Sequence, residues 1–82
     1  MTFELKTTPE CARLLRNIEN RLIMARTNIT MQSVEEFRPF FEMLYKNRCK
    51  QSLSAFIENH QNSISIFERK LVKTAIEYRQ RL

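Results

Sequence analysis

Apolar residues recur at gaps of three and four positions along most of this chain, which is the spacing of side chains on one face of an α-helix. The longest such run lies between residues 37 and 60 and contains four of the six phenylalanines. Pro39 suits the first turn of a helix, and no further proline interrupts the run. We therefore predict a central helix at about 39–60, around which the rest of the chain packs. Its apolar face comprises Phe37, Phe41, Leu44, Tyr45, Cys49, Leu53, Phe56 and Ile57.

Two further stretches with helical spacing flank the central run. Before it, Thr8 can cap a helix that has proline at its first position and Glu10 in its first turn, which predicts a helix at about 9–28. After it, Ser65 and Glu68 have the spacing of a capping box, in which each side chain accepts a hydrogen bond from the other residue's backbone. This signal predicts a last helix at about 65–81.

Ser33 and Glu36 form a second capping-box sequence shortly before Pro39. A proline six residues into a helix removes one backbone hydrogen bond and clashes with the preceding turn. We therefore expect a short helical turn at 34–38, followed by the central helix. A single kinked helix through Pro39 is the alternative.

The first residues show a different, alternating pattern. Phe3 and Leu5 fall on one side of an extended chain, and Glu4 and Lys6 fall on the other. A lone strand is not stable without a partner. We expect residues 2–7 to form an extended arm that either lies on the helices or pairs with its copy across a dimer.

These elements predict an all-α fold, a small antiparallel three-helix bundle that forms one domain over residues 1–82. A chain of this size buries only a modest core. The apolar faces are wide, with Ile23, Met24, Val72 and Ile76 near their edges. Either self-association as a homodimer or ordinary apolar surface residues would account for this width.

The absence of glycine excludes several classes of fold. Phosphate-binding loops, dinucleotide-binding turns and tight β-hairpins need backbone conformations or close approaches that glycine supplies. Helix ends in the left-handed conformation must then use another residue, and Asn28 and Asn62 are the best candidates.

Two cysteines are too few for a disulfide framework, and Cys11 and Cys49 are too far apart for a redox motif. Both fall on predicted apolar faces, so we expect buried free thiols and a reducing compartment. The chain shows no signal-peptide pattern and no apolar run of membrane-spanning length. We expect a soluble, intracellular protein with no membrane association.

The formal charge of +5 belongs entirely to residues 46–82, which hold eight Lys and Arg against three Glu, whereas residues 1–45 hold six of each sign. A basic patch in the second half could bind nucleic-acid phosphates or an acidic protein surface. The simplest alternative is a solvated helix face in which Glu42 and Lys46 form an ordinary ion pair.

No set of residues has the spacing of a catalytic or metal site. His60, the only histidine, is expected in the last turn of the central helix, where a positive charge suits the helix dipole. It shares no ligand spacing with the cysteines. We expect no enzyme activity, metal or cofactor; a helical enzyme that uses Arg13, Arg16 and Lys50 to hold a charged substrate ranks third among the hypotheses.

The leading hypothesis is therefore a non-enzymatic protein-interaction module, such as an adaptor, inhibitor or regulator, that binds a larger partner through a helix face. The alternative is a basic nucleic-acid-binding regulator, in one version a dimer whose paired arms form a ribbon that enters the groove. Aromatic, methionine and arginine side chains are the usual anchors at interfaces, and Met24 is one such candidate. The predicted partner-binding residues are Tyr45, Arg48, Lys50, Arg69, Lys73 and Tyr78.

Overall fold

The computed structural model describes residues 8–82, which form four α-helices and one 3₁₀ helix with no strand among them. The predicted all-α class is confirmed for this part of the chain. The predicted arm at 2–7 lies outside the described residues. The elements in chain order are α1 (Pro9–Arg26), η2 (Ile29–Met31), α2 (Val34–Lys46), α3 (Lys50–His60) and α4 (Ile66–Gln80).

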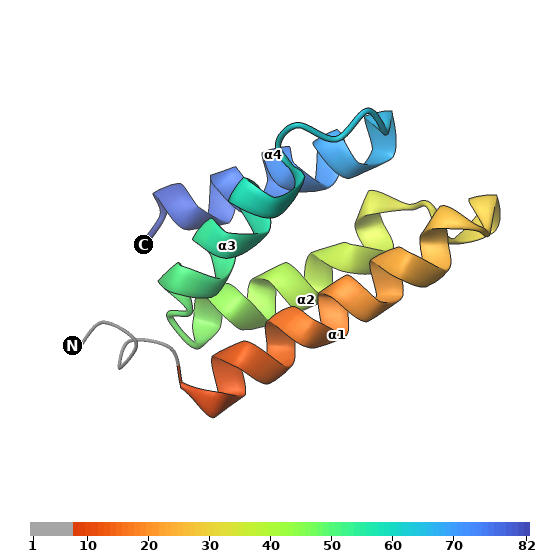
Figure 1. The fold of residues 1–82 in the computed structure, drawn as a ribbon. Helices are drawn as coiled ribbons and strands as arrows, with labels where there is room; N and C mark the ends of the chain where they lie inside the picture. The colour runs from red at the N-terminus through yellow and green to blue at the C-terminus, as the bar shows by residue number, and fades with distance from the viewer. Residues whose placement is uncertain (1–7) are drawn as a thin grey trace.

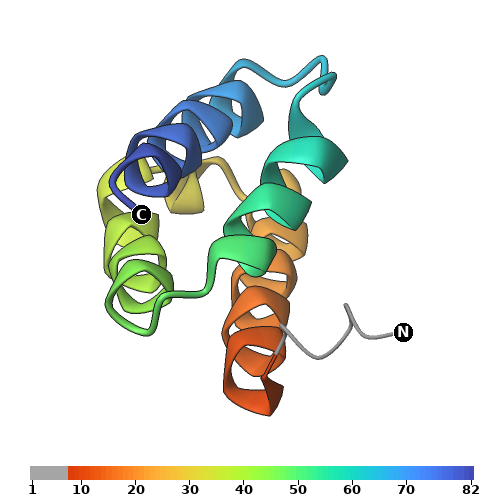
Figure 2. The same ribbon diagram turned by 90° about the vertical axis from the view of Figure 1, so that its left-hand side faces the viewer.

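The four helices surround one core. α1 and α2 run antiparallel and side by side (Figure 1). α3 leads away from the end of α2 at a steep angle, and α4 then runs back above α2 (Figure 1; Figure 2). Both α1 and α4 pack against α2 and against α3. The largest fully buried side chains come from all four helices: Phe37, Phe41, Phe56, Ile18, Leu22, Leu44, Leu53 and Leu71.

The first and last helices agree with their predicted bounds to within two residues. Thr8 caps α1, and its hydroxyl accepts a hydrogen bond from the Cys11 N–H at 3.1 Å. Ser65 caps α4, and its hydroxyl accepts one from the Glu68 N–H at 3.2 Å. Local capping signals therefore located both starts correctly.

The predicted central helix at 39–60 is wrong, because the chain breaks into α2 and α3 at residues 47–49. Arg48 has φ 55°, in the left-handed region that ends helices. The apolar spacing from Leu44 to Cys49 and Leu53 runs on through the break, so periodicity alone could not reveal it. The three-helix bundle is therefore corrected to four helices. Neither Asn28 nor Asn62 takes the left-handed cap that we expected of them.

The predicted separate turn at 34–38 is also wrong, because α2 begins at Val34 and continues through Pro39. The alternative, one helix that runs through the proline, is the observed one over residues 34–46. Ser33 is its N-cap residue, but the Ser33 side chain makes no capping hydrogen bond. Glu36 instead forms an ion pair with Arg21 of α1 at 3.0 Å, so this capping box does not form.

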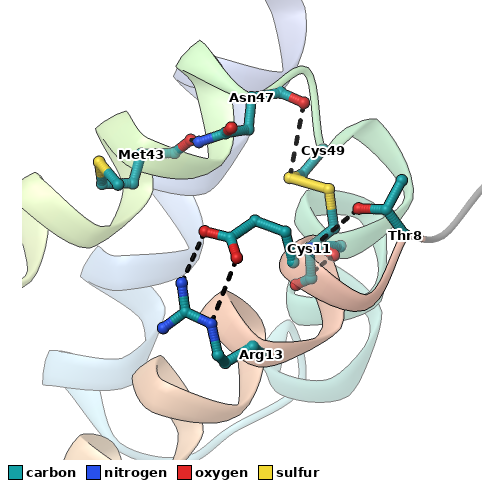
Figure 3. Close-up of a disulfide and its surroundings, with 8 residues drawn as sticks. Thr8, Cys11, Arg13, Met43, Asn47 and Cys49 are labelled. Atoms are coloured by element: carbon teal, nitrogen blue, oxygen red, sulfur yellow. Dashed lines mark hydrogen bonds and ion pairs between the residues drawn. A yellow bond between two sulfur atoms is a disulfide. The ribbon is translucent and has the colours of Figure 1, made fainter.

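Cys11 and Cys49 form a disulfide that joins the first turn of α1 to the residue before α3 (Figure 3). Their Cα atoms are 5.5 Å apart, and both residues are buried. This contradicts the expected free thiols and argues against the expected reducing compartment. No helix within residues 8–82 has the length and apolar character needed to cross a membrane.

Candidate interaction surfaces

The structure divides the six predicted partner-binding residues among four environments. Arg69 and Lys73 line a groove on α4, whereas Tyr45 and Arg48 line a small cavity where α2 ends. Lys50 is exposed at the start of α3 and lines neither hollow. Tyr78 is only 5% exposed and packs in the core.

The groove on α4 is lined by residues of that helix alone and has a volume of about 270 Å³. One face of α4 points into the core, and the groove lies on the outward side. Val72 is buried at its base, while Ile66 and Ile76 are 66% and 37% exposed. Three cationic side chains complete the lining, which comprises Ile66, Arg69, Lys70, Val72, Lys73 and Ile76.

The cations of the α4 groove have no acidic partner among the described residues. Arg69, Lys70 and Lys73 are all exposed, and none of them takes part in an ion pair formed within residues 8–82. Their positive charge is therefore not neutralised by the rest of the fold. We call these six lining residues the α4 groove.

A second basic hollow lies where the α2–α3 turn meets the end of α4. This cavity has a volume of about 140 Å³ and is lined by Tyr45, Lys46, Arg48, Arg81 and Leu82. The guanidinium of Arg81 lies 5.2 Å from the centre of the Tyr78 ring, and the Tyr45 and Tyr78 rings are 5.7 Å apart. The cavity shares no lining residue with the α4 groove, and each hollow holds three of the eight basic side chains of residues 46–82.

Lys46 does not form the ion pair with Glu42 that the solvated-face interpretation predicted. Within residues 8–82 neither side chain takes part in a salt bridge. Lys46 instead contributes to the cavity at the end of α2.

A third hollow, of about 490 Å³, runs between α1 and α3. Small and apolar side chains form much of its lining, and His60 lies at one end. Its lining residues are Ala12, Leu15, Arg16, Glu19, Gln51, Ser52, Ala55, Asn59 and His60. None of the predicted partner-binding residues belongs to it.

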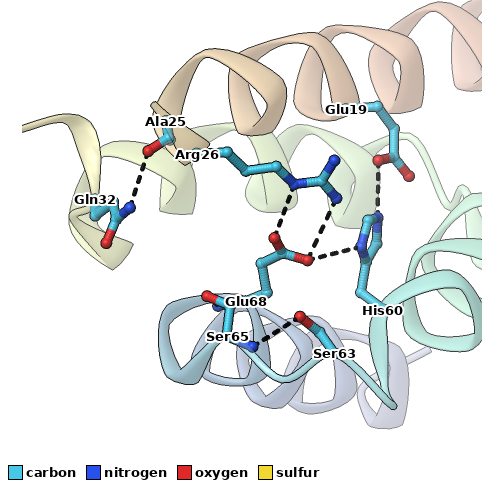
Figure 4. Close-up of polar contacts among 8 residues, drawn as sticks. All are labelled: Glu19, Ala25, Arg26, Gln32, His60, Ser63, Ser65 and Glu68. Carbon is cyan, nitrogen blue, oxygen red and sulfur yellow. Dashed lines mark hydrogen bonds and ion pairs between the residues drawn. The ribbon is translucent and has the colours of Figure 1, made fainter. Parts of the chain in front are cut away.

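Buried His60 and Glu68 form a polar network with Glu19 and Arg26 of α1, whose side chains are more exposed (Figure 4). The Nε2 of His60 is 2.8 Å from Glu19 Oε1, and its Nδ1 is 3.3 Å from Glu68 Oε1. Arg26 Nε donates to Glu68 Oε2 at 2.9 Å. Both ring nitrogens of His60 therefore face carboxylate oxygens. The network ties α1, α3 and α4 together.

Glu68 is the carboxylate on which this network converges. Burial raises the pKa of Glu68, but hydrogen bonds from Arg26, Ser63 and His60 and the charge of Arg26 outweigh it, so that its pKa lies below the ordinary value of 4.5. The Glu68 side chain is 8% exposed. Its carboxylate therefore does not return to the Ser65 backbone, as a complete capping box would require. Sequence reasoning missed this role, because a lone histidine and a capping glutamate eight residues later gave no sign of a partner in α1.

Both carboxylates of this network are engaged within it, by His60 or by Arg26. Among the residues that the structure describes, no group of three or more His, Cys, Asp or Glu is placed to hold a metal ion. Met24, a predicted anchor on α1, is 57% exposed and lies outside all three hollows.

Comparison of this chain with protein-family models, curated proteins and solved structures found no match.

Proposed function

We propose that this protein is a non-enzymatic interaction module whose α4 groove binds an acidic amphipathic segment of a partner protein. The observation that carries the proposal is an apolar groove edged by three cations with no acidic partner among residues 8–82. An amphipathic helix docks in such a groove by placing apolar side chains every three or four residues along it. Acidic residues beside those anchors would meet Arg69, Lys70 and Lys73.

The mixture of apolar and basic side chains favours a protein partner over nucleic acid. Exposed Ile66 and Ile76 would gain from burial against other apolar side chains. A phosphate backbone would engage the cations but leave these isoleucines without a partner. Complementary charge would then add to the association rate and to specificity.

The same charge argues against a symmetric homodimer through this face. In a two-fold dimer each groove would contact the same groove of the other copy. Six cations would then meet with no acidic side chain from either groove, and like charges across an interface are unfavourable. A second copy of this chain is therefore a poor occupant of the α4 groove.

The proposal is tested with a designed helical peptide that carries leucine at helical spacing and glutamate on the flanking positions. We expect saturable binding by fluorescence anisotropy at about 50 mM salt, weakened as salt screens the charges. The double variant Arg69→Glu, Lys73→Glu should lose at least about tenfold in affinity, since each removed charge pair contributes on the order of 1 kcal/mol and each reversed charge repels. A peptide with lysine in place of glutamate should bind the variant better than the native chain.

The control is Arg16→Glu, which reverses one positive charge on α1, outside the groove. It should retain binding of the acidic peptide. Equal binding of the acidic and basic peptides by the native chain would contradict the proposal. Tight, salt-sensitive binding of duplex DNA without binding of either peptide would favour the nucleic-acid alternative instead.

A further inference from the structure

The turn that ends α2 has a form that normally uses glycine. The Cys49 N–H donates to the Leu44 carbonyl at 2.8 Å, and the Arg48 N–H donates to the Tyr45 carbonyl at 3.0 Å. These two bonds define the Schellman motif, in which the residue after the helix cap takes the left-handed conformation. Arg48 occupies that position with φ 55°, the only positive φ among the described residues.

An arginine in this position is less favourable than glycine for the fold. A left-handed conformation brings Cβ too close to the following carbonyl oxygen, a clash that glycine avoids. Non-glycine residues in such conformations cluster at functional sites. The exposed Arg48 side chain lines the cavity described above, so backbone strain and a basic cavity coincide at one residue.

Three cations line this cavity, and no acidic side chain lines it. Lys46, Arg48 and Arg81 line it, and none of them forms an ion pair in the part of the chain that the structure covers. Like charges around one hollow repel one another, and an anion bound between them would relieve that repulsion. The Tyr45 side chain also lines the cavity and carries a hydroxyl donor.

The size of the cavity limits what it can hold. Its volume of about 140 Å³ lies below the roughly 300–1,000 Å³ of pockets for drug-sized ligands. It corresponds to about four or five water molecules at roughly 30 Å³ each, which is room for one small tetrahedral group. Guanidinium groups present paired donors that match the oxygens of phosphate.

We propose that the cavity formed by Tyr45, Lys46, Arg48 and Arg81 is a binding site for a phosphate group, either free or as the terminal group of a small monoester. The site is separate from the α4 groove and does not depend on the function proposed for it. The three cations bind the oxyanion by charge-assisted hydrogen bonds, and the strained turn holds Arg48 at the mouth of the cavity.

The test is a titration with inorganic phosphate in which amide chemical shifts are recorded by NMR. Chloride is used to keep the ionic strength constant. We expect saturable shifts centred on the α2–α3 turn and the end of α4. Arg48→Gly and Arg81→Gln should each weaken binding at least about tenfold, because each removes a charge-assisted donor. Arg48→Gly should also raise the melting temperature, which shows that the loss of binding does not come from unfolding.

The matched control is Arg16→Gln, which removes one positive charge from α1, outside this cavity. It should bind phosphate as tightly as the native chain. Phenyl phosphate is titrated in parallel: tighter binding than that of inorganic phosphate identifies a monoester as the natural ligand, and equal binding identifies free phosphate.

Two results would overturn the proposal. One is a set of shifts that does not saturate, or that chloride alone reproduces. The other is an equal loss of binding in Arg16→Gln and Arg48→Gly, which would indicate general charge screening.

Discussion

His60 lies between two glutamates that are 41 and 8 residues away from it in the sequence. The sequence placed it correctly at the end of a helix, and it is the last residue of α3. Its environment is nevertheless set by α1 and α4, since Glu19 and Glu68 supply the facing carboxylates. At this scale the fold depends on Glu68, which is buried, carries a lowered pKa and holds both His60 and Arg26.

Replacement of Glu68 should remove a pH-dependent part of the stability. The pKa of Glu68 is lower in the folded chain than its ordinary value of 4.5, so its contribution is fully present above the unfolded pKa and is lost as the pH falls through the folded pKa. Glu68→Gln should therefore destabilise the protein by about 1–3 kcal/mol at pH 7, because it weakens the hydrogen bond to Arg26 and leaves the buried His60 poorly satisfied. The difference should shrink below about pH 4. Urea unfolding from pH 3 to pH 7 measures it.

Glu77→Gln is the matched control for this experiment. Glu77 is exposed on the same helix and forms no ion pair within residues 8–82. It should change the unfolding free energy by less than about 0.5 kcal/mol at either pH. A Glu68→Gln penalty that stays constant from pH 3 to pH 7 would show that the ionised carboxylate is not the stabilising form.

At the scale of elements, the break between α2 and α3 is the feature that most changes the architecture. Leu44, Cys49 and Leu53 keep a spacing that a continuous helix would also have. The direction of α3 is instead decided by the left-handed backbone at Arg48. Asparagine was the expected left-handed residue because it tolerates that conformation best after glycine. The residue at this position is instead an arginine, for which the left-handed conformation is unfavourable.

Arg48→Gly should stabilise the fold by about 1 kcal/mol, because glycine adopts the left-handed conformation without the steric clash. Asn47→Gly is the matched control. Asn47 has φ −91°, which needs no glycine, and its side chain donates to the Met43 carbonyl at 2.9 Å. The control should therefore lose stability. Chemical denaturation of both variants measures the difference, and a loss of stability in Arg48→Gly would disprove the strain at this turn.

At the scale of the whole molecule, the stabilisation expected from the disulfide between Cys11 and Cys49 is large relative to the unfolding free energy of so short a chain. An 82-residue domain has an unfolding free energy of roughly 4–12 kcal/mol. Closing a loop between residues 38 positions apart restricts the unfolded chain by about 4 kcal/mol in the chain-entropy model. The disulfide therefore adds stability to a fold whose core is small because the chain is short.

Reduction should consequently lower the midpoint of urea unfolding by an amount that corresponds to about 4 kcal/mol. The double variant Cys11→Ala, Cys49→Ala should lose a similar amount and should not respond to a reducing agent. Urea unfolding curves of the native chain with and without reductant measure this loss of stability. No change on reduction of the native chain would show that the disulfide does not stabilise the fold.

The grouping of the basic side chains of residues 46–82 is also visible only in the whole molecule. The sequence showed that residues 46–82 carry the entire excess of five positive charges. In the structure, three of these cations line the α4 groove and three line the cavity at the α2–α3 turn. The α4 groove also contains exposed isoleucines, whereas the cavity is small and mainly polar in its side chains. This division is why we propose different ligands for the two hollows.

The sequence by itself determined the helical class, the starts of α1 and α4, and the core residues contributed by the central run. These properties are local, because capping signals and apolar spacing depend on residues within a few positions of one another. The tertiary structure decided the break at Arg48, the pairing of Cys11 with Cys49, the partners of His60 and the grouping of the cations. Each of these brings together residues that are distant in sequence, and their approach depends on the direction the chain takes after each turn. Periodicity records which face of a helix is buried, and it carries no information about which helix will cover that face.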